Sequence, residues 1–188
     1  MTKQKKINNK SNVQNHLRKL LLTALFAALT AVGALLRVPV GQISITLQTF
    51  FTCMAGLLLG PYWGALSQLI YLLLGLIGVP IFSEGGGLMY LARPTFGFLL
   101  GMALMAFLVG LLTRRRHGFW WLLLSGAVGT VALYLVGLPY YCFAMGGALS
   151  FGQAAVSGCL IFLPFDLLKL VCCALLGSRL LPVLRRFT

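Results

Sequence analysis

Long apolar stretches separated by short polar, glycine or proline breaks constrain the fold of this chain more than any other feature. The stretches cover residues 20–36, 43–79, 94–112, 119–138 and 153–177. A helix that crosses a hydrocarbon layer of about 30 Å needs about 17–25 apolar residues. The chain is 60% hydrophobic and only 9% charged, whereas an ordinary soluble domain is about 25% charged. We therefore expect an integral membrane protein.

The longest stretch, 43–79, is interrupted only by Gly60-Pro61. As one helix it would be roughly 55 Å long, nearly twice the membrane core, so it is expected to form two helices joined at this break. The sequence thus predicts an all-α membrane protein with six transmembrane helices. We expect a basic cytoplasmic tail over 1–19, a single membrane domain over 20–181 and a cytoplasmic C-terminal end over 182–188.

Lysine and arginine are distributed very unequally along the chain, which has a formal net charge of +13. Twelve of the 15 cations fall on one side of the predicted membrane, in the N-terminal tail, the loop around Arg115 and the C-terminal end. Cytoplasmic segments of membrane proteins carry this excess. The pattern predicts a multi-pass protein of the cell membrane with both termini in the cytoplasm. It also suits contact with anionic membrane lipid and argues against nucleic acid as a partner.

Asp166 and Lys169 break this pattern, because they lie inside the last apolar stretch. An ionisable group at the centre of a membrane helix costs at least ~2.5–3.5 kcal/mol on insertion scales, so each needs a partner. A spacing of three residues places both side chains on one helix face. They form either an internal ion pair that neutralises itself or, as we favour, a ligand site facing the bundle interior, with Pro164 loosening the backbone beside it.

Arg93 follows the glycine-rich loop 80–93 and opens the fourth predicted helix, with Pro94 as its first residue. It is either a membrane-interface anchor or, beside a helix N-terminus that favours anions, a clamp for a carboxylate. Taken together, Arg93, Lys169 and Asp166 carry one surplus positive charge. This set is therefore predicted to bind a small monoanion.

Several other residues allow two interpretations. Gln48 and Gln68 lie in the second and third predicted helices and could simply hydrogen-bond across helices. Tyr90 is either a membrane-interface aromatic or a wall of the pocket. Small residues at positions that include Ala24 and Ala28 allow another helix to approach the first one closely.

Residues for enzymatic chemistry are scarce. The two histidines, His16 and His117, lie in the tail and in a loop, and the five cysteines are scattered through apolar stretches. The sequence has no phosphate-binding GxxxxGK[ST] motif. We expect no catalytic residues, no metal site and no cofactor.

Four segments carry a resemblance to a known family. They are ISITLQTFF (43–51), AGLLLGPYWGALSQLIYLLLGLIGVPIF (55–82), GGGLMYLARPTFGFLLG (85–101) and FLPFDLLKL (162–170). They closely resemble the BioY family, the biotin-binding S components of energy-coupling-factor (ECF) transporters. The resemblance spans nearly the whole membrane region and leaves out the tails.

The resemblance implies a six-helix S component that captures biotin at the extracellular face. Import would be driven by an ECF module of one transmembrane coupling subunit and two ABC ATPases. The family's ligand residues carry over to Arg93, Asp166 and Lys169, and an alanine pair at the coupling subunit carries over to Ala24 and Ala28. Tyr90 and Gln48 complete the expected ligand set. The alternatives are an S component for another small anionic vitamin and a structural membrane protein that does not transport.

Overall fold

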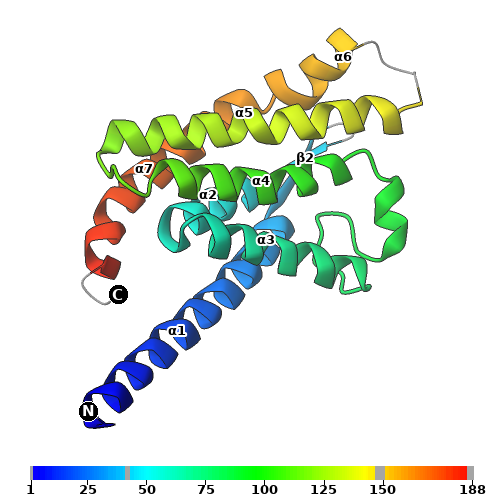
Figure 1. Cartoon of the computed structure of the whole chain (residues 1–188). Coiled ribbons are helices and arrows are strands. Elements are labelled where there is room, and N and C mark those ends of the chain that lie inside the picture. Colours follow the sequence, from blue (N-terminus) through cyan, green and yellow to red (C-terminus); the bar gives the residue numbers. More distant parts are fainter. Residues whose placement is uncertain (1, 41–42, 147–150, 186–188) are drawn as a thin grey trace.

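The computed structural model describes residues 2–40, 43–146 and 151–185 and forms an elongated helical bundle (Figure 1). Three helical segments are long and apolar enough to cross a membrane, namely Val13–Leu35, Phe119–Ala144 and Gly152–Pro182. Shorter helices lie between them, and α4 contacts α2, α3 and α5. The expected all-α membrane fold is confirmed.

Helix α1, Thr2–Leu35, is longer than expected, since the helix begins at Thr2 rather than near Leu20. Residues 2–19 contain no glycine or proline, so nothing interrupts the backbone hydrogen bonds there. The N-terminal part of α1 projects away from the other helices (Figure 1). Further along, Thr23, Ala27 and Thr30 are buried against the bundle.

A short β-hairpin follows α1, where we expected the second helix to begin near Ile43. Strand β1, Arg37–Val40, pairs antiparallel with β2, Ile43–Thr46, and α2, Gln48–Leu59, starts only afterwards. The expected helix start is therefore wrong. β-branched residues dominate both strands and favour extended structure, and Pro39 cannot donate a hydrogen bond within a helix. At the end of the hairpin, the Leu47 amide bonds to the Gly33 carbonyl of α1 at 3.0 Å.

The break at Gly60-Pro61 is confirmed. Gly60 has φ = 80°, a conformation that favours glycine, and Pro61 is the first residue of α3, Pro61–Leu76. Helix α2 has 12 residues, about 18 Å of helix, so it is shorter than a full crossing. Gly110 of α4 lies against the turn, since a Cβ there would be 2.4 Å from the Gly60 carbonyl carbon. The turn and α4 are therefore closely packed.

The segment that joins α3 to α4 is folded rather than loose. Helix α4, Phe96–Leu112, begins directly after it. The segment contains an isolated bridge between Phe82 and Gly85 and a 3₁₀ helix, η1, Leu88–Ala92. Pro94 precedes α4 instead of being its first residue. The ring of Phe82 packs on Gly75 of α3, where any Cβ would lie 2.1 Å from the ring. This contact presses the segment onto the bundle.

Helix α5, Phe119–Ala144, continues beyond Leu138, where the sequence suggested an end. Pro139 lies inside the helix, so one backbone hydrogen bond is lost. Membrane helices tolerate this loss where neighbouring groups and packing compensate. Tyr140 donates a hydrogen bond to the Leu91 carbonyl and Tyr141 is fully buried, so packing holds the extra turns.

The last apolar stretch is a broken helix. It begins with α6, Phe151–Ala155, passes through a π-helical turn, η2, Val156–Leu160, and continues as α7, Leu163–Arg185. The helix therefore ends beyond the expected Gly177. Pro182 near its end does not stop it. The expected loosening of the backbone near Pro164 is present, because the helix is broken at Ile161 and Phe162, just before α7 begins at Leu163.

Candidate ligand-binding site

A cavity lies inside the bundle, where β2, α2, α4, α5, η2 and α7 meet the segment 83–95. Its empty volume is about 620 Å³, part of which is open to the surroundings. Leu99, Met102 and Leu133 form apolar walls, and Asp166 and Lys169 supply polar groups. The cavity therefore combines an apolar wall with a few polar groups, as ligand sites do.

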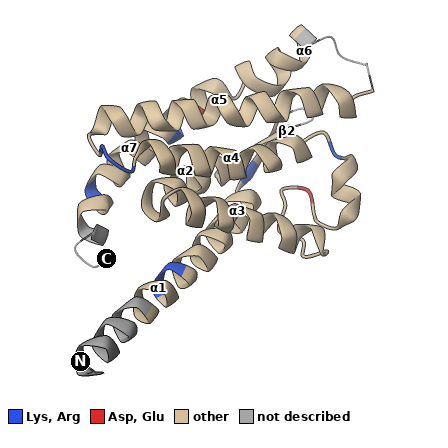
Figure 2. Cartoon of the chain, in the orientation of Figure 1, with Lys and Arg blue, Asp and Glu red and all other residues tan. Residues whose placement is uncertain are grey.

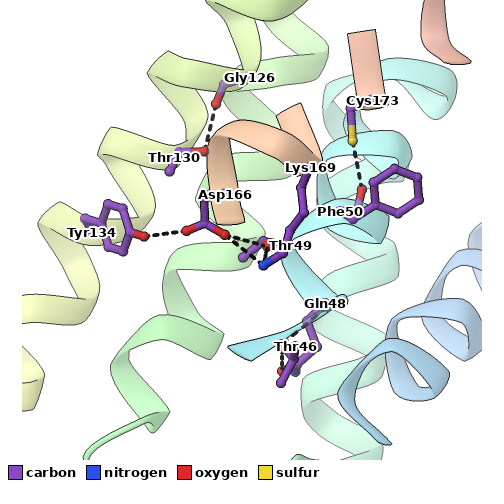
Figure 3. Close-up of polar contacts among 10 residues, drawn as sticks. All are labelled: Thr46, Gln48, Thr49, Phe50, Gly126, Thr130, Tyr134, Asp166, Lys169 and Cys173. Carbon is purple, nitrogen blue, oxygen red and sulfur yellow. Dashed lines mark hydrogen bonds and ion pairs between the residues drawn. The ribbon is translucent and has the colours of Figure 1, made fainter. Parts of the chain in front are cut away.

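Asp166 and Lys169 form a direct ion pair in this cavity (Figure 3). The Lys169 Nζ atom is 2.8 Å from Asp166 Oδ1. The Asp166 side chain is 9% exposed and the Lys169 side chain 13%. The two residues predicted to face the bundle interior therefore do so.

Two hydroxyl groups complete this cluster, and the sequence analysis missed both. Thr49 of α2 donates to Asp166 Oδ1 at 3.3 Å and accepts from Lys169 Nζ at 3.1 Å. Tyr134 of α5 donates to Asp166 Oδ2 (Figure 3). Each carboxylate oxygen of Asp166 thus accepts a hydrogen bond from a different neighbouring helix. A hydroxyl on an apolar helix gives little warning of such a role, because it can also bond to its own backbone.

The broken helix explains the position of Asp166. The Ile161 amide bonds to the Val156 carbonyl at 3.3 Å, and the Asp166 amide bonds to the Phe162 carbonyl at 2.9 Å, so regular helix resumes just there. Asp166 lies in the first turn of α7, where the helix dipole stabilises a negative charge. Gly158 of the π-helical turn and Phe162 line the same cavity. The break thus opens space and places the carboxylate beside it.

The segment between α3 and α4 contributes three hydroxyl residues to the cavity lining, Ser83, Tyr90 and Thr95. The Tyr90 hydroxyl is 3.1 Å from Ser83 Oγ and accepts from Thr95 Oγ1 at 3.2 Å. Tyr90 is 3% exposed, and its ring packs against Phe82. Of the two interpretations of Tyr90, the pocket wall is therefore the one that fits.

The two glutamines differ in position. Gln48 lines the cavity and also bonds to its neighbours, with Oε1 accepting from Thr46 at 2.9 Å and Nε2 donating to the Tyr71 hydroxyl at 2.8 Å. Gln68 is not among the cavity residues. It joins α3 to α2 and α1 through hydrogen bonds to Thr52 and Thr30. Gln68 is therefore a cross-helix contact, whereas Gln48 both joins neighbouring residues and lines the cavity; contact between Gln48 and a ligand stays a prediction.

Arg93 does not line the cavity. Its side chain is 57% exposed, and its Nη1 atom lies 3.4 Å from Oε2 of Glu84. Glu84 therefore neutralises Arg93, and the expected charge balance of Arg93, Lys169 and Asp166 did not include this partner. Binding of a small monoanion by these three residues stays a prediction. Figure 2 shows the basic loop between α4 and α5 at the other end of the bundle from the segment that joins α3 to α4. Contact between Arg93 and a ligand carboxylate stays a prediction.

Ala24 and Ala28 lie on the exposed side of α1, whereas Thr23 and Ala27 face the bundle. Their spacing of four residues puts them on one helix face. Their contact with another subunit stays a prediction.

A mostly helical membrane bundle with a buried ion pair in an internal cavity has the architecture of a membrane protein that binds a small solute. Comparison with known proteins agrees with this class. The BioY family model matches residues 3–186, so the chain belongs to the BioY family.

Characterised relatives and a solved structure extend this similarity. The biotin transporter BioY of Thermotoga maritima is 38% identical over 168 residues, covering 87% of this chain and 96% of the relative. The biotin transporter BioY of Rhizobium etli is 41% identical over 179 residues, covering 87% and 93%. The fold is similar to the crystal structure of an S-component for biotin from an ECF-type ABC transporter, with a TM-score of 0.81, 25% identity, and coverage of 89% of this chain and 92% of that one.

Proposed function

We propose that this chain is the biotin-binding subunit of an ECF-type importer and that the cavity around Asp166 and Lys169 binds the vitamin. One observation carries the proposal. A buried, hydrogen-bonded ion pair lines an apolar cavity in a chain whose relatives are named biotin transporters. A buried ion pair adds little to stability compared with apolar side chains, so a role in binding explains its presence.

The chemistry of biotin suits the residues of the cavity. Its ureido ring offers N–H donors to the Asp166 carboxylate and a carbonyl acceptor to the Lys169 ammonium. Leu99, Met102 and Leu133 provide apolar surface for the thiophane ring. Gln48 and Tyr90 present further polar atoms along the wall. The valerate carboxylate is assigned to Arg93.

The proposal includes partners, because this chain is expected to bind biotin but not to hydrolyse ATP. An ECF module of a transmembrane coupling subunit and two ABC ATPases would supply the energy. We place the coupling subunit on the exposed face of α1 that carries Ala24 and Ala28. Both termini would lie in the cytoplasm of a cell whose membrane holds the protein, and biotin would enter the cavity from outside.

Binding of radiolabelled biotin to the purified chain tests the proposal, with excess unlabelled biotin as the competitor. Saturable binding that unlabelled biotin abolishes is expected. A parallel thermal-shift panel of other small vitamins identifies an S component of different specificity, because only its own ligand would raise the unfolding temperature. If neither biotin nor any panel member binds, the structural alternative stands, in which Asp166 and Lys169 only pair with each other.

A further inference from the structure

A second ion pair, between Glu84 and Arg93, lies close in the chain to Tyr90, which lines the cavity. Arg93 Nη1 is 3.4 Å from Glu84 Oε2, and the side chains are 57% and 27% exposed. Glu84 lies in a tight turn, which is closed by an isolated β-bridge between Phe82 and Gly85. The Arg93 amide bonds to the Tyr90 carbonyl at 3.0 Å, at the end of η1. Two anchored backbone segments therefore bring these side chains together.

The neighbours of this pair place it at the rim of the cavity. Ser83, directly before Glu84, lines the cavity, and so does Thr95, two residues after Arg93. Both are within hydrogen-bond distance of the Tyr90 hydroxyl. The pair thus lies outside a hydroxyl cluster that forms one wall of the site.

The charges in and around the site cancel. Among the described residues that line the cavity, Asp166 and Lys169 are the charged ones, and their formal charges sum to zero. At the rim, Glu84 neutralises Arg93 in the same way. A ligand with a carboxylate therefore finds no surplus positive charge, and it has to exchange with a carboxylate already present.

The two ion pairs differ in how readily a ligand carboxylate can replace the carboxylate of the pair. The Lys169 Nζ atom is 2.8 Å from Asp166 Oδ1 and also donates a hydrogen bond to Thr49 Oγ1, and the Lys169 side chain is mostly buried. Arg93 Nη1 is 3.4 Å from Glu84 Oε2, and the Arg93 side chain is more than half exposed, so the pair contributes little to stability. The rim pair is the weaker one, and Glu84 can turn into solvent without leaving a buried charge unpaired.

We propose that Glu84 is a resident carboxylate that an acidic ligand displaces from Arg93, and that it thereby limits affinity for acids but not for neutral analogues. The inference rests on the proposed function, in that it assumes a small acid in this cavity. Arg93 keeps one carboxylate partner throughout, first that of Glu84 and then that of the ligand. Glu84 is then a specificity-determining residue.

The Glu84→Gln variant tests the inference by calorimetry with biotin and with biotinamide, its neutral carboxamide. We expect Glu84→Gln to bind biotin about two- to fivefold more tightly, since it removes a competitor of the strength of an exposed ion pair. Biotinamide affinity should not change. The Glu84→Asp variant keeps the charge and should resemble the unmodified chain. The Arg37→Gln variant removes an exposed cation from β1, which contributes no cavity residue, and should bind both ligands normally.

The same substitution in an Arg93→Gln background separates displacement from a general effect of charge. Displacement requires Arg93, so Glu84→Gln should no longer strengthen biotin binding there. The inference is overturned if Glu84→Gln leaves biotin affinity unchanged, if it strengthens biotinamide equally, or if its effect persists without Arg93. All three results presuppose that the unmodified chain binds biotin. Absence of binding to that chain would instead reject the proposed function.

Discussion

The chain places two carboxylate–cation pairs beside one cavity, in opposite surroundings. Asp166 and Lys169 are three residues apart near the start of α7, with side chains 9% and 13% exposed. Glu84 and Arg93 lie on the segment between α3 and α4, with side chains 27% and 57% exposed. The same chemistry therefore occurs once inside the bundle and once at its rim.

The difference shows how surroundings decide what an ion pair can do. Thr49 and Tyr134 reach the buried pair from two other helices and fix its oxygens in place. A buried charge that loses its partner is costly, so this pair has to remain complete. The Glu84–Arg93 pair is more exposed, and separating it costs little free energy. One pair suits a rigid ligand platform and the other an exchangeable contact.

Removing the buried carboxylate is expected to have the largest effect. Asp166→Asn should weaken biotin binding at least about 30-fold, because losing one partner of a buried, hydrogen-bonded charge pair costs about 2–5 kcal/mol. Calorimetry measures the affinity, and size-exclusion chromatography verifies that the variant stays folded. A folded Asp166→Asn protein with nearly normal affinity would contradict the site assignment.

A smaller loss is expected when only the support of the buried carboxylate is removed. Tyr134→Phe deletes the hydroxyl that donates to Asp166 Oδ2 and should reduce biotin affinity about tenfold, since hydrogen bonds to charged groups contribute about 1.5–3 kcal/mol. Tyr140→Phe on the same helix is the matched control, because that hydroxyl bonds to the Leu91 carbonyl instead. Equal losses in the two variants would show that Asp166 needs no such support.

At the rim, Arg93→Gln should weaken biotin binding by no more than about fivefold, as expected for an exposed ion pair. The loss should shrink further at high salt, which screens exposed charges. A loss as large as that of Asp166→Asn would mean that Arg93 becomes buried against the ligand, and the contrast between the two pairs would fail.

The smallest change in biotin affinity is expected for a substitution on α1, which contributes no residue to either ion pair. Ala28→Leu should leave biotin binding unchanged but reduce biotin uptake in cells that hold the complete transporter, because a larger side chain prevents close helix approach. Val128→Leu gives an exposed position of α5 the same leucine side chain, although it adds one carbon rather than three, and should not affect uptake. Normal uptake by Ala28→Leu would remove this face from the proposed coupling interface.

The sequence was sufficient for the features that follow from hydrophobicity and from backbone chemistry. It predicted the membrane bundle, the break at Gly60-Pro61, and the placement of Asp166 and Lys169 on one helix face toward the bundle interior. Each depends on a local cause, namely a run of apolar residues, a glycine conformation or a spacing within one helix. Such causes can be seen in a single segment.

The missed features depend on contacts between segments distant in the chain. Thr49 and Tyr134 are separated from Asp166 by 117 and 32 residues, and only the packed helices bring them together. Helix α5 runs through Pro139 because Tyr140 and Tyr141 are held by neighbours. The sequence analysis overlooked that Glu84 neutralises Arg93, because only the folded loop shows how close the two side chains lie.

The central claim is that the buried pair binds the ligand rather than only neutralising itself. Equilibrium binding of radiolabelled biotin to the folded double variant Asp166→Asn, Lys169→Met tests it most directly, because no buried charge is left unpaired. If the pair is the ligand platform, the double variant should bind biotin no better than Asp166→Asn alone. Recovery of the unmodified affinity would show that the pair is structural and would contradict the account.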